Sequence, residues 1–103
     1  MAITFDLSKV EGFEWDKGNL GHINKHKVKY TECEEIFGNI PFVAEDEVHS
    51  EIEERFHALG KANRGRLLFV SFTIRNKKIR VISARDQDRK EKVQTIKARG
   101  ETK

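Results

Sequence analysis

The chain has 103 residues, of which 37% are hydrophobic and 36% charged, and its formal net charge is +3 at pH 7. This length and composition predict one α+β domain over residues 1–103 with a modest core, and they exclude a large ligand cavity. No apolar run approaches the roughly 20 residues that cross a bilayer, and the single cysteine excludes an internal disulfide, which favours a reducing cytoplasm without membrane contact.

The first half of the chain predicts short strands followed by two helices. Alternating apolar residues favour a strand around Phe13 and Trp15, preceded by another over residues 3–7. Residues 16–27 favour a helix with Asp16 as its N-cap.

A second helix is predicted over residues 30–39. Thr31 and Glu34 have the spacing of a capping box, in which each side chain satisfies the other residue's free backbone N–H. Both predicted helices therefore lie before the main part of the sheet.

From Pro41 the apolar pattern changes from period 3.6 to period 2. Residues 67–74 are apolar almost throughout, which predicts a central strand covered on both faces. A tight turn at residues 76–78 and a weak basic helix over residues 88–100 complete the pattern. The strands are predicted at residues 41–45, 55–62, 66–75 and 78–85.

The predicted fold is therefore an antiparallel sheet with two N-terminal helices and a C-terminal helix, in the order β-α-α-β-β-β-β-α. In its last strand, strict alternation places Ile79, Val81 and Ser83 on one face and Arg80, Ile82 and Ala84 on the other.

Charge is divided unevenly along the chain. Residues 1–54 hold 5 Lys and Arg against 13 Asp and Glu, whereas residues 55–103 hold 15 against 4. Such segregation indicates either a polyanionic or acidic partner, or two halves that neutralise each other in the fold. The sequence leaves both interpretations open.

The sequence gives little indication of a metal site or of a nucleophilic residue. His22 and His26 share one helix face, but no third ligand accompanies them at the spacing of a zinc site. Cys33 lies on an apolar helix face, which is typical of a small core residue. There is no glycine-rich phosphate loop and no serine elbow. We therefore expect neither a metal nor a cofactor.

The remaining candidates are cations that a sheet would hold in fixed positions. Arg55, Arg80 and Arg85 lie on or at the ends of predicted strands, and guanidinium groups match phosphate oxygens. Lys25 and His26 extend from the first helix. Cations of this kind, with a histidine to move protons, are what metal-free RNA cleavage requires.

Each candidate also has a structural interpretation. Arg55 has Glu51 and Glu54 as nearby partners, and Arg80 can pair with an acid on a neighbouring strand. His57 is expected at the surface, and Trp15 is typical of a core aromatic residue. The residues alone thus predict a small α+β domain with a basic face.

Taken in order, several motifs resemble the BrnT family of toxins from type II toxin–antitoxin pairs, which are similar in fold to RelE ribonucleases. The ordered set, rather than any single motif, carries the resemblance, and it covers most of the chain. The motifs are FEWDKGN (13–19), HINKHKV (22–28), ECEEIFGNIP (32–41), HSEIEERFHALGKANRGRLLFVSFTIR (49–75) and KIRVISARD (78–86).

The resemblance implies a cytoplasmic, metal-independent endoribonuclease that inhibits translation. It also implies a BrnA-type antitoxin that binds the toxin and attaches the complex to operator DNA. Arg80 and Arg85 are expected to hold the scissile phosphate, with His26 or His49 as the acid–base group. The implied catalytic residues are Lys25, His26, His49, Glu54, Arg55, Arg80 and Arg85, and the implied RNA-binding residues are Trp15, Arg75, Lys77 and Lys78.

The sequence departs from these relatives in two places. Lys27 stands where relatives often carry glycine, so we expect a different turn after the first helix. No tyrosine or histidine follows Arg85, although some RelE-like enzymes carry a reactive side chain there. Two other functions are therefore kept: a nucleic-acid-binding module without catalysis, and a partner-binding protein whose basic face meets an acidic polypeptide.

Overall fold

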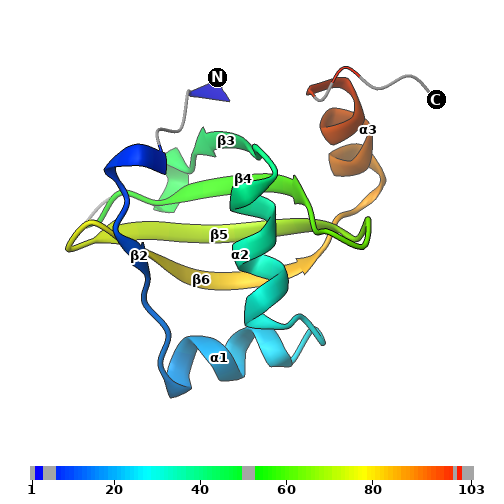
Figure 1. The fold of residues 1–103 in the computed structure, drawn as a ribbon. Coiled ribbons are helices and arrows are strands. Elements are labelled where there is room, and N and C mark those ends of the chain that lie inside the picture. Colours follow the sequence, from blue (N-terminus) through cyan, green and yellow to red (C-terminus); the bar gives the residue numbers. More distant parts are fainter. Residues whose placement is uncertain (1, 4–6, 50–52, 99, 101–103) are drawn as a thin grey trace.

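The computed structural model describes residues 2–3, 7–49, 53–98 and 100. Within these residues, one sheet and three α-helices form the α+β fold that the sequence predicts (Figure 1). The strands are β1 (Ala2–Ile3), β2 (Gly12–Phe13), β3 (Phe42–Glu45), β4 (Phe56–Lys61), β5 (Leu67–Arg75) and β6 (Lys78–Asp86). The helices are α1 (Lys17–Asn24), α2 (Tyr30–Gly38) and α3 (Arg89–Ala98), with 3-10 helices η1 (Leu7–Lys9) and η2 (Glu47–His49).

The described strands follow the order β1-β3-β4-β5-β6-β2 across the sheet. The pairs from β1 to β6 are antiparallel, as predicted, but β2 pairs with β6 in parallel. The sheet is therefore mixed. A two-residue strand at the edge carries too little pattern for its direction to be read from sequence.

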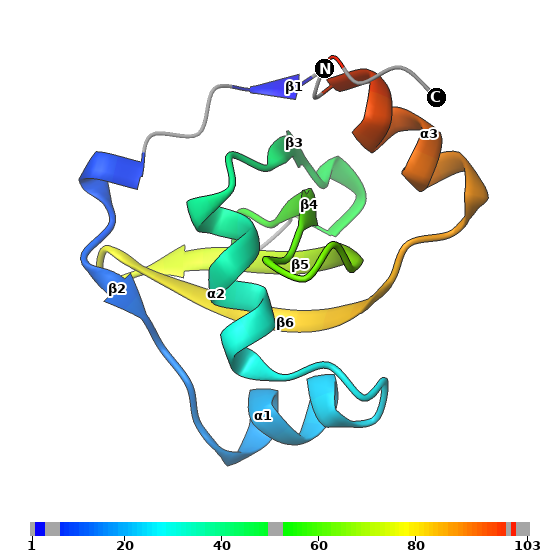
Figure 2. The same ribbon diagram turned by 45° about the vertical axis from the view of Figure 1, so that its right-hand side comes forward.

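Helices α1 and α2 cover one face of the sheet, as Figures 1 and 2 show. The core lies between them and the three central strands, where α2 residue Phe37 packs edge-on against Phe72 of β5. Burial of this apolar surface supplies the main stabilisation of the domain. The opposite side of the sheet, which we call the open face, is covered only at one end, by α3 (Figure 2).

A β-bulge in β6 decides which side chains reach the open face. Ser83 pairs with Ser71, but the next pair along β5 joins Phe72 to Val81, so Ile82 is an extra residue in β6. Strict alternation is therefore wrong beyond this point. The bulge places Ala84, rather than Ser83, on the core face together with Val81.

Helix α1 begins as predicted and ends earlier. The Asp16 carboxylate accepts a hydrogen bond from the Asn19 N–H at 3.1 Å, and the Asn19 side chain accepts one from the Asp16 N–H at 2.8 Å. The helix stops at Asn24 because Lys27 adopts a φ of 58°, the left-handed region that favours glycine.

The N-cap of α2 lies two residues before the predicted one. Its N-cap is Lys29, whose backbone N–H donates to the Glu32 carboxylate at 3.0 Å. Thr31 and Glu34 therefore lie inside the helix and form no capping box. Glu34 instead accepts a hydrogen bond from the indole of Trp15 at 3.0 Å.

The strands from β3 onward lie where period 2 predicts them. The turn between β5 and β6 is a tight one, with φ values of 53° at Asn76 and 63° at Lys77, as expected of a type I′ hairpin. At the N-terminus, Leu7 belongs to η1 rather than to a strand, and β2 ends before Trp15. Residues 4–6 of that predicted strand lie outside the described residues.

Helix α2 approaches β4 most closely at Gly60. A Cβ atom at Gly60 would lie 2.6 Å from the Cβ of Ile36, well inside van der Waals contact. Ile36 is fully buried, so it has little room to move. A glycine at this position therefore sets the spacing between helix and sheet.

We predict that Gly60→Ala lowers the free energy of unfolding by about 1–3 kcal/mol, the usual cost of overpacking a core. Gly21→Ala is the matched control, because Gly21 lies exposed on α1 with nothing within 4 Å of its Cβ position. Urea unfolding of both variants measures the difference. Equal stabilities for the two variants would contradict the close-approach explanation.

Candidate functional site

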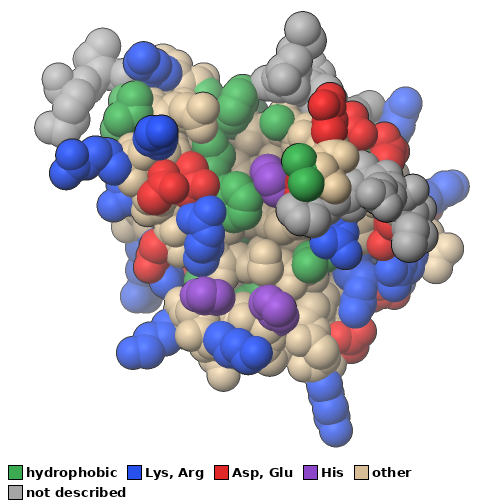
Figure 3. Space-filling view, turned by 180° about the vertical axis from the view of Figure 1, so that it is seen from behind, with side chains coloured by type: hydrophobic (Ala, Val, Ile, Leu, Met, Phe, Trp, Pro, Cys, Tyr) green, Lys and Arg blue, Asp and Glu red, His purple; other side chains and the backbone are tan. Residues whose placement is uncertain are grey.

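The open face contains a hollow between the sheet and α3. Figure 3 views this side, where a histidine lies among hydrophobic side chains near the centre and Lys and Arg side chains are spread around the edges. The hollow has a volume of about 360 Å³, at the small end of ligand pockets. Its lining comes from β3, β4, β5 and α3: Phe42, Ala44, His57, Leu59, Phe69, Glu91 and Gln94.

The hollow also bears on the prediction that the strand at residues 67–74 is covered on both faces. That strand is covered on its core face, but on the open face Phe69 is only half-buried and forms part of the hollow. Ser71 and Thr73 on the same face are buried, so the strand is fully covered only in its second half.

Arg85 lies at the edge of the hollow, stacked on Phe69. Its guanidinium carbon is 4.2 Å from the centroid of the Phe69 ring, and the two residues are paired across β5 and β6. A cation over an aromatic ring is attracted by the ring's negative face and is held in a fixed orientation. The bulge in β6 is what brings Arg85 to this side.

The Arg85 guanidinium also forms a two-pronged ion pair with Glu91 of α3. Nη1 and Nη2 donate to the two carboxylate oxygens at 2.8 and 2.9 Å. Glu91 is fixed in turn by a capping box with Asp88 at the start of α3. The hydrogen bonds with Arg85 lower the pKa of the Glu91 carboxyl.

Arg80 points to the same face farther along β6. Its Nη1 lies 2.8 Å from an oxygen of Asp16 and 3.3 Å from an oxygen of Glu14, and the hydrogen bond with Asp16 raises the pKa of Arg80. At about 3.3 Å per residue, Arg80 and Arg85 are separated by roughly 13–16 Å along the strand. The structure therefore places Arg80 and Arg85 on one face of the sheet, but too far apart to contact the same phosphate.

His57 lies across the hollow from Arg85, against the same phenyl ring. Its ring centroid is 4.7 Å from that of Phe69. Its Nε2 is 2.9 Å from Oδ2 of Asp46, whose side chain is only 7% exposed. From the sequence, His57 was expected to be a surface residue. Its carboxylate partner, Asp46, lies eleven positions earlier in the chain, and no spacing rule predicts this pair.

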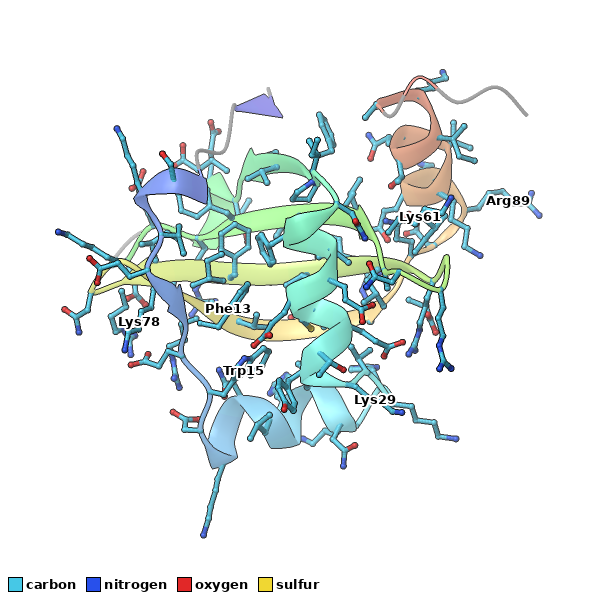
Figure 4. All side chains as sticks on the ribbon, in the orientation of Figure 1. Phe13, Trp15, Lys29, Lys61, Lys78 and Arg89 are labelled. Atoms are coloured by element: carbon cyan, nitrogen blue, oxygen red, sulfur yellow. The ribbon has the colours of Figure 1, made fainter. Side chains whose placement is uncertain are left out.

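The other predicted residues lie at separate places. Trp15 packs against the core and meets Tyr30 edge-on, which are the contacts of a structural residue (Figure 4). Lys25 and His26 are exposed in the turn after α1. Among the described residues, neither forms a hydrogen bond or ion pair with Arg80 or Arg85. The side chain of His49 lies outside the described part of the structure.

Glu54 and Arg55 contact the neighbouring segments through their backbone carbonyl groups. The Glu54 carbonyl accepts a hydrogen bond from the Thr73 hydroxyl at 2.6 Å, and the Arg55 carbonyl accepts one from the N–H of Asp46 at 2.8 Å. This segment therefore helps to hold Asp46 in place. Glu51 lies outside the described residues.

The predicted RNA-binding cations Arg75, Lys77 and Lys78 lie together at the β5–β6 hairpin. Figure 4 places Lys78 at the end of the sheet opposite to α3 and Arg89. Arg75 forms an ion pair with Glu53 at 3.1 Å. This group and Arg85 thus occupy opposite ends of the domain.

Ion pairs between the two halves of the sequence explain much of its charge segregation. Arg80 pairs with acids of the β2–α1 connection, Arg75 with Glu53, and Arg66 with Glu32 at 3.0 Å. Arg66 also pairs with Asp86 at 2.7 Å and so ties β6 to α2. Mutual neutralisation, one of the two interpretations of the charge pattern, is therefore confirmed for these pairs.

The described residues contain no group of three His, Cys, Asp or Glu side chains arranged to hold a metal ion. Cys33 is fully buried, and this burial raises the pKa of its thiol to about 12, so it is a core residue as predicted. In the same part of the chain, no helix has the length and apolar character needed to traverse a bilayer.

Comparison with known proteins gives one family match. Residues 15–91, most of the chain, match the family described as ribonuclease toxin, BrnT, of type II toxin-antitoxin system. The matched segment begins at Trp15 and ends at Glu91, so it includes the residues that line the hollow except Gln94. No curated protein matched the chain.

We predict that the ion pair between Arg85 and Glu91 makes stability depend on acid pH. The folded-state pKa of Glu91 lies below its ordinary value of 4.5, so the pair stabilises the fold above pH 4.5 and the contribution is lost as the pH falls through the folded pKa. Glu91→Gln keeps the capping geometry but removes the charge. We expect it to lower stability by about 1 kcal/mol at pH 7, because the pair is two-pronged and Glu91 is mostly buried.

Thermal unfolding between pH 3 and pH 7 measures this effect, and the curves of the wild type and Glu91→Gln should converge at the acid end. The control is Glu91→Gln in an Arg85→Ala background, where the same substitution should cost much less. A difference that stays constant with pH would show that the charge of Glu91 does not act through Arg85.

Proposed function

The chain belongs to the BrnT family of ribonuclease toxins from type II toxin–antitoxin systems, and we propose that it acts as a metal-independent endoribonuclease. In the proposed reaction, a 2′-hydroxyl attacks the adjacent phosphate, and the bond from phosphorus to the 5′-oxygen breaks. The phosphate gains charge during this attack, so fixed cations that meet it lower the barrier. The proposed site is the open face of the sheet.

The observation that carries the proposal is the placement of Arg85. Its guanidinium is stacked on Phe69 at the edge of a hollow and is 39% exposed, so RNA can reach it. Glu91 presents two oxygens to the guanidinium fork with the geometry that a phosphate would use. Among the described contacts, Nε of Arg85 makes no hydrogen bond, which leaves a donor for the substrate.

We assign the scissile phosphate to Arg85 and a neighbouring phosphate to Arg80. The two side chains share a face but lie too far apart along β6 to meet one phosphate. Arg80 uses only Nη1 for its carboxylate partners in the described structure, so its other donors are available. Phe69 offers a flat surface beside Arg85 on which a base can stack.

The remaining assignments rest on the family resemblance. Lys25, Arg55 and Glu54 are proposed to add charge or to orient other groups, and a histidine, His26 or His49, to transfer protons. Arg75, Lys77 and Lys78 are proposed to hold the RNA farther along its backbone, at the hairpin end of the sheet.

Membership of a type II toxin family implies an antitoxin partner and an RNA target. We propose that the antitoxin is of the BrnA type and that it attaches the complex to operator DNA. We further propose that the toxin acts in the cytoplasm and inhibits translation by cutting RNA there. Neutralisation is then explained if the antitoxin covers the open face.

We predict that Arg85→Ala slows RNA cleavage by about 10²–10³-fold, the usual cost of losing one donor that stabilises developing charge. The assay follows a 5′-labelled single-stranded RNA in the presence of EDTA and identifies the 2′,3′-cyclic phosphate end. Lys9→Ala is the control for charge, because Lys9 is exposed in η1, far from α3 (Figure 1).

Cleavage by Arg85→Ala at the wild-type rate would remove Arg85 from the site. Loss of wild-type cleavage in EDTA would contradict the metal-independent mechanism. Intact RNA with tight, strongly salt-dependent binding would instead identify a nucleic-acid-binding module without catalysis.

A further inference from the structure

A histidine–carboxylate pair stands inside the proposed site, on the opposite side of Phe69 from Arg85. His57 and Arg85 both contact this ring, at 4.7 and 4.2 Å from its centroid. They come from β4 and β6, the two neighbours of β5 in the sheet. His57 and Arg85 therefore lie on the two strands that flank Phe69, and both are on the open face.

The partner of His57 is a buried carboxylate. Asp46 is 7% exposed, and burying a carboxylate costs free energy unless another polar group compensates it. Its Oδ2 lies 2.9 Å from Nε2 of His57, which is hydrogen-bond distance. The contact is thus built into the fold and differs from a chance encounter of exposed side chains.

This contact favours one tautomer of the imidazole. A carboxylate can only accept a hydrogen bond, so the neutral ring that donates to Asp46 is the one with its proton on Nε2. In the neutral ring, Nδ1 then has a free lone pair. Within the described part of the chain, no protein group is hydrogen-bonded to Nδ1, which leaves it for a substrate hydroxyl.

The ring is also held in position. Ala44 on β3 and Ser71 on β5 are its cross-strand neighbours, and Phe69 lies against one side. A base with a fixed orientation, supported by a carboxylate on its other nitrogen, is the arrangement that activates hydroxyl nucleophiles in enzymes. Glu91 lines the hollow, and Arg85 lies over the Phe69 ring at its edge.

From this geometry we infer that His57 is the general base of the RNA cleavage reaction and that Asp46 is its positioning residue. The inference deepens the proposed ribonuclease function and rests on it. Nδ1 of His57 takes the proton of the 2′-hydroxyl as the 2′-oxygen bonds to phosphorus. The bond from phosphorus to the 5′-oxygen breaks, and that oxygen takes a proton from solvent. The protonated His57 then returns its proton to water.

His57 fits this role better than His26, one of the two candidates taken from the resemblance. His26 lies in the turn after α1, whereas His57 shares a ring contact with the proposed phosphate-binding arginine.

The test is the cleavage rate of His57→Ala and His57→Gln with labelled single-stranded RNA in EDTA. Both variants should lose about 10²–10⁴-fold in rate, the contribution of a well-placed base. Because His57 is 35% exposed, its removal leaves no sealed cavity, and thermal unfolding verifies the fold. Free imidazole should restore cleavage in His57→Ala but not in Arg85→Ala, a result that a purely structural role cannot produce.

Asp46→Asn tests the positioning role. It should lower kcat while leaving KM unchanged, because Asp46 acts through His57 and does not contact the RNA. His22→Ala is the matched histidine control, since His22 is exposed on α1, and it should cleave at the wild-type rate.

The outcomes separate this inference from the proposed function. If the wild type cleaves and His57→Ala cleaves equally fast, the inference fails and the ribonuclease function stands. The same holds if His26→Ala loses activity and His57→Ala does not. If the wild type does not cleave at all, the proposed function fails, and this inference fails with it.

Discussion

The extra residue at Ile82 is the constraint on which the open face depends. In a regular strand, Arg80 and Arg85 would lie on opposite faces, because five positions is an odd number of alternations. One bulged residue restores them to the same side while Ile79, Val81 and Ala84 all remain in the core. A bulge is a small local cost to the hydrogen-bond ladder. Its consequence is that a single strand supplies both the apolar core and two cations on the other surface.

The described arginines near the sheet are held by ion pairs with carboxylates and do not form a patch of unpaired positive charge. Nearly every described arginine near the sheet has a carboxylate partner, and Arg80, Arg75 and Arg66 find theirs in the acidic first half of the chain. These pairs are partly exposed, so each contributes little to stability. Their effect is to hold guanidinium groups in defined orientations. An arginine that is already oriented loses less conformational entropy when a phosphate replaces its carboxylate partner.

The sequence was a good guide where the pattern is local and strong. The strands from β3 to β6, the tight turn at Asn76 and the cap at Asp16 each follow from periodicity or from a side chain acting within a few residues. The prediction failed where the deciding contact is distant. Nothing in KIRVISAR marks Ile82 as extra, because the bulge is defined by the register against β5. The pairing of His57 with Asp46 depends on the antiparallel register of β3 and β4, and the short strand β2 has too few residues to encode its direction.

Three adjacent strands give the site its geometry. Phe69 on β5 and Arg85 on β6 are paired directly across the strands, and His57 on β4 lies diagonally to Phe69, opposite Ser71, so the sheet fixes their separations. A loop would not hold an acid–base group and a phosphate contact at such constant distances. Glu91 is different, because it belongs to a helix that packs on the sheet through few residues, with Thr95 as its buried side chain. The rigid part of the site therefore comes from the sheet. The carboxylate that an RNA phosphate must displace from Arg85, that of Glu91, comes from α3.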